Sequence, residues 1–148
     1  MTHLTAPQLI QLVLDSFEAE RTGNTKWGRE LMSPDFIKTS MQLYKGKPFH
    51  RFELANDTAN AVENVYAVEG REFHVWRSAA NEETQTVFIE LAEVQPEQDG
   101  PHTLWIYSLV CDIKDGRIAH TRHYGDPALL KSGLTPEHVR LVVEGGAV

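Results

Sequence analysis

The sequence has 148 residues, of which 41% are hydrophobic and 24% are charged, and its formal net charge is -7. This ordinary globular composition excludes disordered and fibrous proteins, and the absence of a Lys/Arg cluster leaves no nucleic acid or anionic membrane among the expected partners. No apolar run approaches the roughly 18 residues of a membrane span, and Met1 to Ala6 has no signal-peptide features. Cys111 is the only cysteine, so no internal disulfide or cysteine-based metal site can form within one chain. We therefore expect one cytoplasmic domain over residues 1–148.

Two helices are predicted at the start of the chain. Thr5-Ala6-Pro7-Gln8 has the form of a capping box with proline just inside the helix. Apolar residues then recur at helical spacing, which predicts a helix from about Ala6 to Arg21 that ends before the next glycine. Asn24 can cap a second, short helix that carries Trp27. Ser33-Pro34 ends it, because the residue before a proline disfavours the helical conformation.

The next segment is predicted to be extended and then helical. Phe36 to Leu43 is expected to be extended, and Lys45-Gly46-Lys47-Pro48 is typical of a turn. Phe49 to Asn64 is rich in Ala, Glu and Asn, which predicts a third helix.

From Val65 onward, short runs of β-branched and aromatic residues alternate with polar or Gly/Pro stretches, as in an antiparallel meander. Four strands are predicted, at about Tyr66 to Ser78, Thr84 to Val94, Thr103 to Ile113 and Arg117 to Gly125. Asp115-Gly116 is the expected tight hairpin turn between the last two, and Thr135 to Glu144 is expected to form a capped helix. Helices at the start and strands later in the chain predict the α+β class.

The strand from Thr103 to Ile113 has apolar residues on both faces. By alternation, one face carries Trp105, Tyr107, Leu109, Cys111 and Ile113, and the other carries Leu104, Ile106 and Val110. A strand covered on both sides fits a curved sheet with helices or a cavity inside and a partner subunit outside. We therefore expect a homodimer.

Two segments resemble the NTF2-like superfamily, which includes SnoaL-like polyketide cyclases, ketosteroid isomerases and phenazine-biosynthesis A/B proteins. The first is Leu31-Met32-Ser33-Pro34-Asp35-Phe36-Ile37, after two helices. The second is Asp115-Gly116-Arg117-Ile118, leading to Arg122-His123-Tyr124-Gly125-Asp126-Pro127. The resemblance spans most of the chain. It implies a cone-shaped domain in which a curved antiparallel sheet wraps around N-terminal helices, an internal pocket for a small-molecule ligand, and usually a homodimer.

The resemblance also implies which side chains reach that pocket. The matching positions are Thr121, His123 and Gly125 on the last strand and Trp105, Tyr107 and Leu109 on the preceding one. His123 is the leading catalytic candidate, because it stands where phenazine A/B proteins carry a catalytic glutamate. A histidine can act as a general acid or base or donate to a ligand carboxylate. The alternative is a structural histidine held by its neighbours.

His120 lies near His123 in the sequence, but the two are not expected to bind a metal together. A spacing of three residues in a strand sends their rings to opposite faces. We therefore predict no metal site, and we place His120 and Arg122 on the outer face or in a dimer contact.

The remaining candidates each have a structural alternative. His74 can enter the pocket or lie at the surface or an interface. Trp27 and Tyr44 can line the pocket mouth or belong to the core. Asp126 can accept a hydrogen bond from His123 or a ligand, or it can cap a following helix.

At two sets of catalytic positions this sequence differs from relatives, and these differences reduce the number of activities that we expect. Ketosteroid isomerases use a carboxylate base and a helix tyrosine, and alignment by eye places Ser40 and Ser16 there, which disfavours that activity. The paired aspartates around an arginine that activate water in limonene-epoxide-hydrolase relatives are not apparent.

Two hypotheses about function remain open, because this fold serves both catalysts and binding proteins. The first is a cofactor-independent isomerase, cyclase or dehydratase that acts through His123 on a small aromatic or polyketide-like metabolite. The second is a non-catalytic small-ligand-binding protein of the same fold, in which Trp27, Trp105 and Tyr107 form an apolar cage.

Overall fold

The computed structural model describes residues 2–41, 50–53, 70–96, 102–125 and 131–146. In chain order the elements are α1 (Ala6–Thr22), the π-helical turn η1 (Trp27–Leu31), β1 (Met32–Ser40), β2 (His50–Glu53), β3 (Glu72–Asn81), β4 (Thr86–Pro96), β5 (His102–Lys114), β6 (Arg117–Tyr124), β7 (Lys131–Leu134) and α3 (Pro136–Gly146). Among these residues no helix is both long and apolar enough to cross a membrane.

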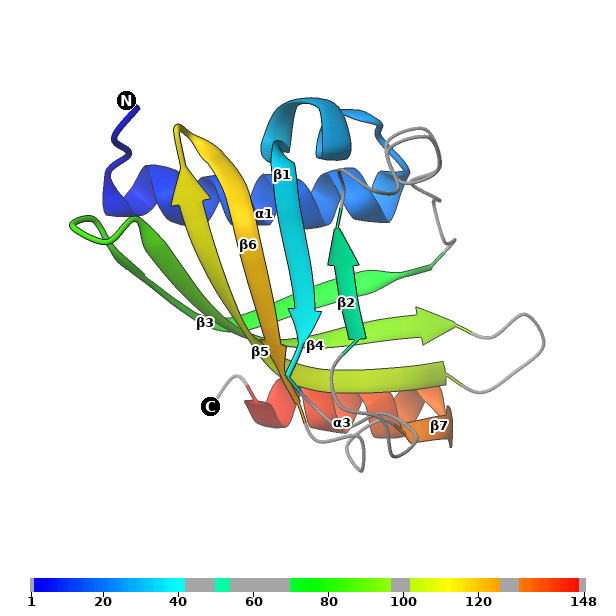
Figure 1. The fold of residues 1–148 in the computed structure, drawn as a ribbon. Coiled ribbons are helices and arrows are strands. Elements are labelled where there is room, and N and C mark those ends of the chain that lie inside the picture. Colours follow the sequence, from blue (N-terminus) through cyan, green and yellow to red (C-terminus); the bar gives the residue numbers. More distant parts are fainter. Residues whose placement is uncertain (1, 42–49, 54–69, 97–101, 126–130, 147–148) are drawn as a thin grey trace.

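The strands form one sheet in the order β2-β1-β6-β5-β4-β3, and β7 pairs with β5. The meander from β3 to β6 is antiparallel, as predicted. β1 pairs with β6 in parallel, so the sheet is mixed. Figure 1 shows that the sheet is bent, with α1 on its concave side and α3 on the opposite side. This is the α+β arrangement expected from the sequence, a curved sheet wrapped around the first helix.

The first helix forms for the reasons that its sequence indicates. The Gln8 side-chain oxygen accepts a hydrogen bond from the Thr5 backbone N–H at 2.9 Å, and this satisfies one donor at the N-terminus. The helix ends at Thr22, one residue later than predicted, and Gly23 follows in the left-handed conformation with φ 66°. A glycine adopts that conformation without steric cost.

The predicted hairpin between β5 and β6 is confirmed. Asp115 and Gly116 both have positive φ, at 52° and 77°. A two-residue turn with positive φ at both positions matches the right-handed twist of the strands that it joins.

Two predictions between residues 32 and 64 differ from the structure. β1 begins at Met32, so Pro34 lies within a strand, at an irregularity in the pairing of β1 with β6 where a missing N–H is tolerated. The helix predicted from Phe49 to Asn64 is wrong over β2, which pairs antiparallel with β1. Pairing with β1, the preceding strand, overrides the local helical preference there. The rest of that segment and the turn at Lys45-Gly46-Lys47-Pro48 lie outside the described residues.

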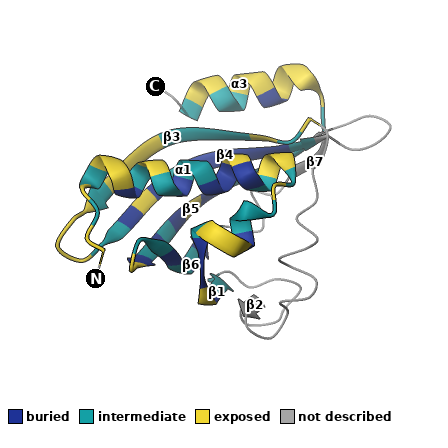
Figure 2. Ribbon diagram, turned by 90° about the horizontal axis from the view of Figure 1, so that it is seen from above, coloured by how far each residue is buried: buried dark blue, intermediate teal, exposed yellow. Residues whose placement is uncertain are grey.

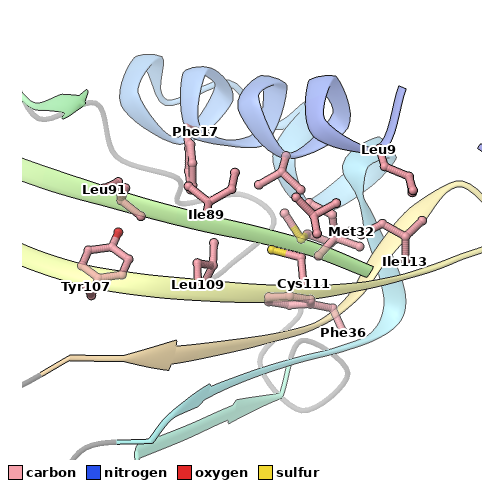
Figure 3. Close-up of a cluster of buried hydrophobic side chains, with 13 residues drawn as sticks. Leu9, Phe17, Met32, Phe36, Ile89, Leu91, Tyr107, Leu109, Cys111 and Ile113 are labelled. Carbon is pink, nitrogen blue, oxygen red and sulfur yellow. The ribbon is translucent and has the colours of Figure 1, made fainter. Parts of the chain in front are cut away.

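The main core lies between α1 and the concave face of the sheet. Leu9, Val13 and Phe17 recur on the buried face of α1. The inward residues of the strands complete the cluster: Met32, Phe36, Val87, Ile89, Leu91, Tyr107, Leu109, Cys111, Ile113 and Ile118. Figure 3 shows these side chains filling the space beneath α1. The predicted inward set on β5 is thereby confirmed from Tyr107 to Ile113, and Trp105 packs against the same cluster.

A second, smaller cluster covers part of the convex face. Leu104 and Ala92 are buried there against Val139 of α3, and the Trp76 indole N–H donates to the Val143 carbonyl at 2.9 Å. Figure 2 shows α3 across the sheet from α1. Part of the outer apolar face that the sequence assigned to a partner subunit is therefore covered by the chain's own last helix.

The packing of α3 on Trp76 predicts different effects on stability for alanine substitutions at two neighbouring glycines. A Cβ added at Gly146 would collide with the Trp76 ring, whereas one at Gly145 would meet nothing within 4 Å. Gly146→Ala should lower the free energy of unfolding by about 1 kcal/mol, because overpacking displaces the indole. Gly145→Ala should be neutral or stabilise by up to about 1 kcal/mol, because alanine favours the helix. Urea unfolding followed by tryptophan fluorescence measures both, and equal effects would contradict the described packing.

Candidate functional site

A cavity of about 270 Å³ lies between α1, η1 and the concave face of the sheet. This volume is near the lower end of the range for small-molecule sites. Six of the residues predicted to reach the pocket line it, namely Trp27, Trp105, Tyr107, Leu109, Thr121 and His123. Alternation puts Trp105 and Tyr107 of β5 and Thr121 and His123 of β6 on the inner face, and η1 adds Trp27.

The other predicted site residues are not part of this lining. His74 lies on β3 outside the cavity, with its Nε2 2.6 Å from a carboxylate oxygen of Glu72. Tyr44 and Asp126 lie outside the described residues.

His123 is buried against the inner wall, with 8% of its surface exposed. Its ring stacks on Tyr107, with centroids 5.1 Å apart and planes at 26°. Within the described part of the chain, no hydrogen bond to the imidazole is found. Burial, together with the positive charge of Lys38, holds the pKa of His123 well below its usual range. The ring is therefore neutral at physiological pH, and one of its nitrogens has a free lone pair.

A second polar group lies at another part of the cavity wall, around Glu93 of β4. One Glu93 oxygen accepts from Arg71 Nε at 3.0 Å, from Arg71 Nη2 at 2.7 Å and from Gln95 Nε2 at 2.7 Å. The other accepts from the Tyr107 hydroxyl at 3.0 Å. Arg71 Nη2 also donates to Glu20 of α1 at 2.9 Å. The buried carboxylate is thus compensated by one cation and several donors, as a buried charge must be.

This network shifts the pKa values of Tyr107 and Arg71. Burial raises the pKa of Tyr107 well above its ordinary value, and the adjacent Glu93 raises it further. Burial alone would lower the pKa of Arg71, but Glu20 and Glu93 reverse this and raise it. Tyr107 is therefore a neutral hydrogen-bond donor, and Arg71 is a permanent cation between two carboxylates.

Two buried polar atoms have no hydrogen-bond partner among the described residues. They are the Trp105 indole nitrogen and the Thr121 hydroxyl oxygen. An unsatisfied buried polar group costs about 1–3 kcal/mol, and both residues line the cavity. Each of these groups can donate to an acceptor on a bound molecule.

The structure places His120 away from His123, as predicted. His120 Nε2 lies 3.0 Å from the Thr39 hydroxyl, and Arg122 Nη1 lies 3.1 Å from His120 Nδ1. Arg122 also pairs with Asp112 at 2.6 Å. Because Arg122 donates to Nδ1, the neutral ring carries its proton on Nε2 and donates to Thr39, so it cannot activate that hydroxyl. Among the described residues no group of three or more His, Cys, Asp or Glu side chains could hold a metal ion.

Solved structures similar to this chain identify its fold. An epoxide hydrolase of the LEH-like type from M. tuberculosis superposes with a TM-score of 0.67 at 20% identity, covering 97% of this chain and 96% of that one. The Δ5-3-ketosteroid isomerase from Mycobacterium sp. gives 0.65 at 13% identity, covering 84% and 98%. A putative SnoaL-like polyketide cyclase from Jannaschia sp. gives 0.57 at 15% identity, covering 84% and 90%. The chain has the NTF2-like fold. No family model and no curated protein matches the sequence.

In this NTF2-like fold, the cavity contains ionisable residues that the sequence analysis missed. Glu20, Lys38, Arg71 and Glu93 all line it. Alternation along β4 could have revealed Glu93, because it shares the inward face with Ile89 and Leu91. The sequence indicates the inward position of the other residues less clearly. Glu20 continues the buried stripe of α1, and Lys38 lies two residues after the inward Phe36.

An arginine between two carboxylates is therefore present, although no such aspartate pair is apparent in the sequence. Glu20 comes from α1, Arg71 from just before β3, and Glu93 from β4. These three residues come together only in the folded chain, so no local sequence pattern predicts that they are in contact.

The buried network predicts that substitution of two arginines will lower the free energy of unfolding by unequal amounts. Arg71→Met leaves Glu93 buried without its cation and should lower the free energy of unfolding by about 3–5 kcal/mol. Arg77→Met is the matched control. Its pair with Glu90 is 3.7 Å long and exposed, so it should cost no more than about 1 kcal/mol. Chemical denaturation measures both, and similar small losses would show that Glu93 does not depend on Arg71.

Proposed function

We propose that this chain binds a small aromatic or polyketide-like metabolite in the cavity and catalyses a cofactor-independent proton transfer, with His123 as the general base. The reaction is of the isomerase, cyclase or dehydratase type. The similarity to a ketosteroid isomerase and a SnoaL-like polyketide cyclase supports this class. We also propose a cytoplasmic location, consistent with the sequence composition.

The observation that carries the proposal is the state of the His123 ring. It lines the cavity, is buried, is held neutral and has no described hydrogen-bond partner to occupy its lone pair. A general base needs such a free nitrogen within reach of the proton that it removes. Stacking on Tyr107 orients the ring, and the Tyr107 hydroxyl is itself fixed by Glu93.

The proposed chemistry at His123 balances without a cofactor. The imidazole takes a proton from a carbon next to a carbonyl group of the ligand, and the electrons of the broken C–H bond move into the carbonyl oxygen to form an enolate. The imidazolium then returns the proton to a different carbon, which gives an isomer. In a dehydration, it protonates a departing hydroxyl group instead.

The carboxylates are weaker candidates for the base. Glu93 accepts three hydrogen bonds on one oxygen and one on the other, so little of it is free to take a proton. This argues against water activation by Glu93, even though one similar structure is named an epoxide hydrolase. The Glu93 network instead fits a role in holding Tyr107.

A non-catalytic binding protein is the second candidate. Its support is that His123 has no described hydrogen-bonded partner on its other ring nitrogen to fix the tautomer, as catalytic histidines commonly have. A purely apolar cage is less well supported, because charged and polar side chains line the cavity together with the aromatic ones.

Substitution of His123 separates the two candidates. His123→Gln keeps a hydrogen-bonding side chain but removes the titratable group. Turnover of a substrate should fall by about 10²–10⁴-fold, with smaller effects on ligand affinity. Because the neutral ring is the active form, wild-type turnover should be constant near pH 7 and decline as pH falls through the lowered pKa of His123. That decline should be absent from the variant, and unchanged turnover in the variant would remove His123 as the base.

We further propose a homodimer through the part of the outer face that α3 leaves open. Phe88 on β4 is 48% exposed and pairs with Val110 of β5 on that face. Light scattering at micromolar concentration should find twice the 16.7 kDa chain mass. Phe88→Glu should shift the population to monomer, whereas Leu141→Glu, on the exposed face of α3, should not. A monomeric wild-type protein would contradict the proposal.

A further inference from the structure

The cavity wall formed by β1 and β6 carries a cation that no described acid neutralises. Lys38 lies on β1 and lines the cavity. The acids of the cavity wall, Glu20 and Glu93, are both paired with Arg71. Within the described ranges the side-chain ammonium group of Lys38 has no ion-pair or hydrogen-bond partner. The cavity is therefore electrically asymmetric, with two carboxylates around the single cation Arg71 on one side and a positive group at Lys38 on the other.

Thr121 is the neighbour of Lys38 on the adjacent strand. The parallel register of β1 and β6 pairs these two residues directly, and both side chains line the cavity. Thr121 is 6% exposed, and its hydroxyl is one of the two buried polar atoms without a described partner. A cation and an unused hydroxyl donor are thus placed side by side on the same wall.

His123 follows on the same face of β6, two residues beyond Thr121. The positive charge of Lys38 reaches it, since that charge lowers the His123 pKa. Apolar side chains, including Phe36 and Leu109, flank this group in the cavity lining. The wall therefore combines donors at one point with apolar side chains around them.

From this arrangement we infer that Lys38 and Thr121 form an oxygen-binding subsite for a negatively charged oxygen, a carboxylate or an enolate, on a small planar ligand. All the hydrogen-bonding groups available here can donate, and a lysine supplies a full positive charge. The inference deepens the proposed function and rests on it. The bound oxygen would be the carbonyl oxygen next to the carbon that His123 deprotonates, so the substrates would be enolisable carbonyl compounds.

The subsite can be tested with two probes of nearly the same shape. Naphthoate carries a carboxylate, and naphthamide is its neutral counterpart. Titration calorimetry at neutral pH should find that the wild-type protein binds naphthoate about tenfold or more tightly than naphthamide, the effect of one hydrogen bond to a charged group.

Variants then assign that preference to particular residues. Lys38→Met should weaken naphthoate binding about tenfold or more and leave naphthamide binding nearly unchanged. Thr121→Val, which keeps the shape of the side chain, should weaken naphthoate binding several-fold. Lys114→Met is the matched control: Lys114 is exposed and 4.0 Å from Asp35, so the preference should persist despite the same loss of charge.

The result that overturns the subsite is distinct from the one that overturns the catalytic role of His123. If naphthoate does not bind, or if Lys38→Met affects both probes equally, the subsite is wrong. If His123→Gln retains the naphthoate preference but also retains full turnover, the subsite stands and the proposed base is wrong.

Discussion

The ion pair between Arg71 and Glu93 ties the edge of the sheet to its interior. A carboxylate inside a concave apolar face would be costly by itself, because burial removes the water that stabilises its charge. Arg71 supplies the compensating cation and also reaches Glu20 on α1. One side chain therefore connects the first helix, the start of β3 and the centre of β4, and a polar group can persist beside the core without opening it to water.

Tyr107 joins this network to the opposite wall of the cavity. Its hydroxyl donates to Glu93, and its ring stacks on His123. Both contacts limit the rotation of the same side chain, so the position of the imidazole depends on the acid network through a single intervening ring. A neutral histidine without a hydrogen-bonded partner still has a defined orientation for this reason.

The sequence allowed the fold and one wall of the cavity to be predicted, but not the charges that oppose that wall. Strand alternation correctly placed Tyr107 and His123 inside, because each strand imposes a period of two. It could not pair Arg71 with Glu20, since that contact spans 51 residues. The parallel pairing of β1 with β6 is likewise a long-range contact, and β2 is a strand because it pairs with β1; local propensity determines neither pairing.

The placement of Lys38 also constrains how proton transfer could proceed. Burial lowers the pKa of His123 in the free protein, and the charge of Lys38 lowers it further, which keeps the imidazole neutral but makes it a weaker base. Removing a proton from a bound carbonyl compound creates two charges at once, a cation on His123 and an anion on the ligand oxygen. Lys38 opposes the first and favours the second. The net electrostatic effect of Lys38 on the proton transfer is favourable when the ligand oxygen lies closer to Lys38 than the imidazole does. The attraction to the oxygen then exceeds the repulsion of the imidazolium, because electrostatic interactions grow as distance shortens. A ligand in that orientation neutralises Lys38 as the reaction advances and thereby restores the basicity that the cation had removed.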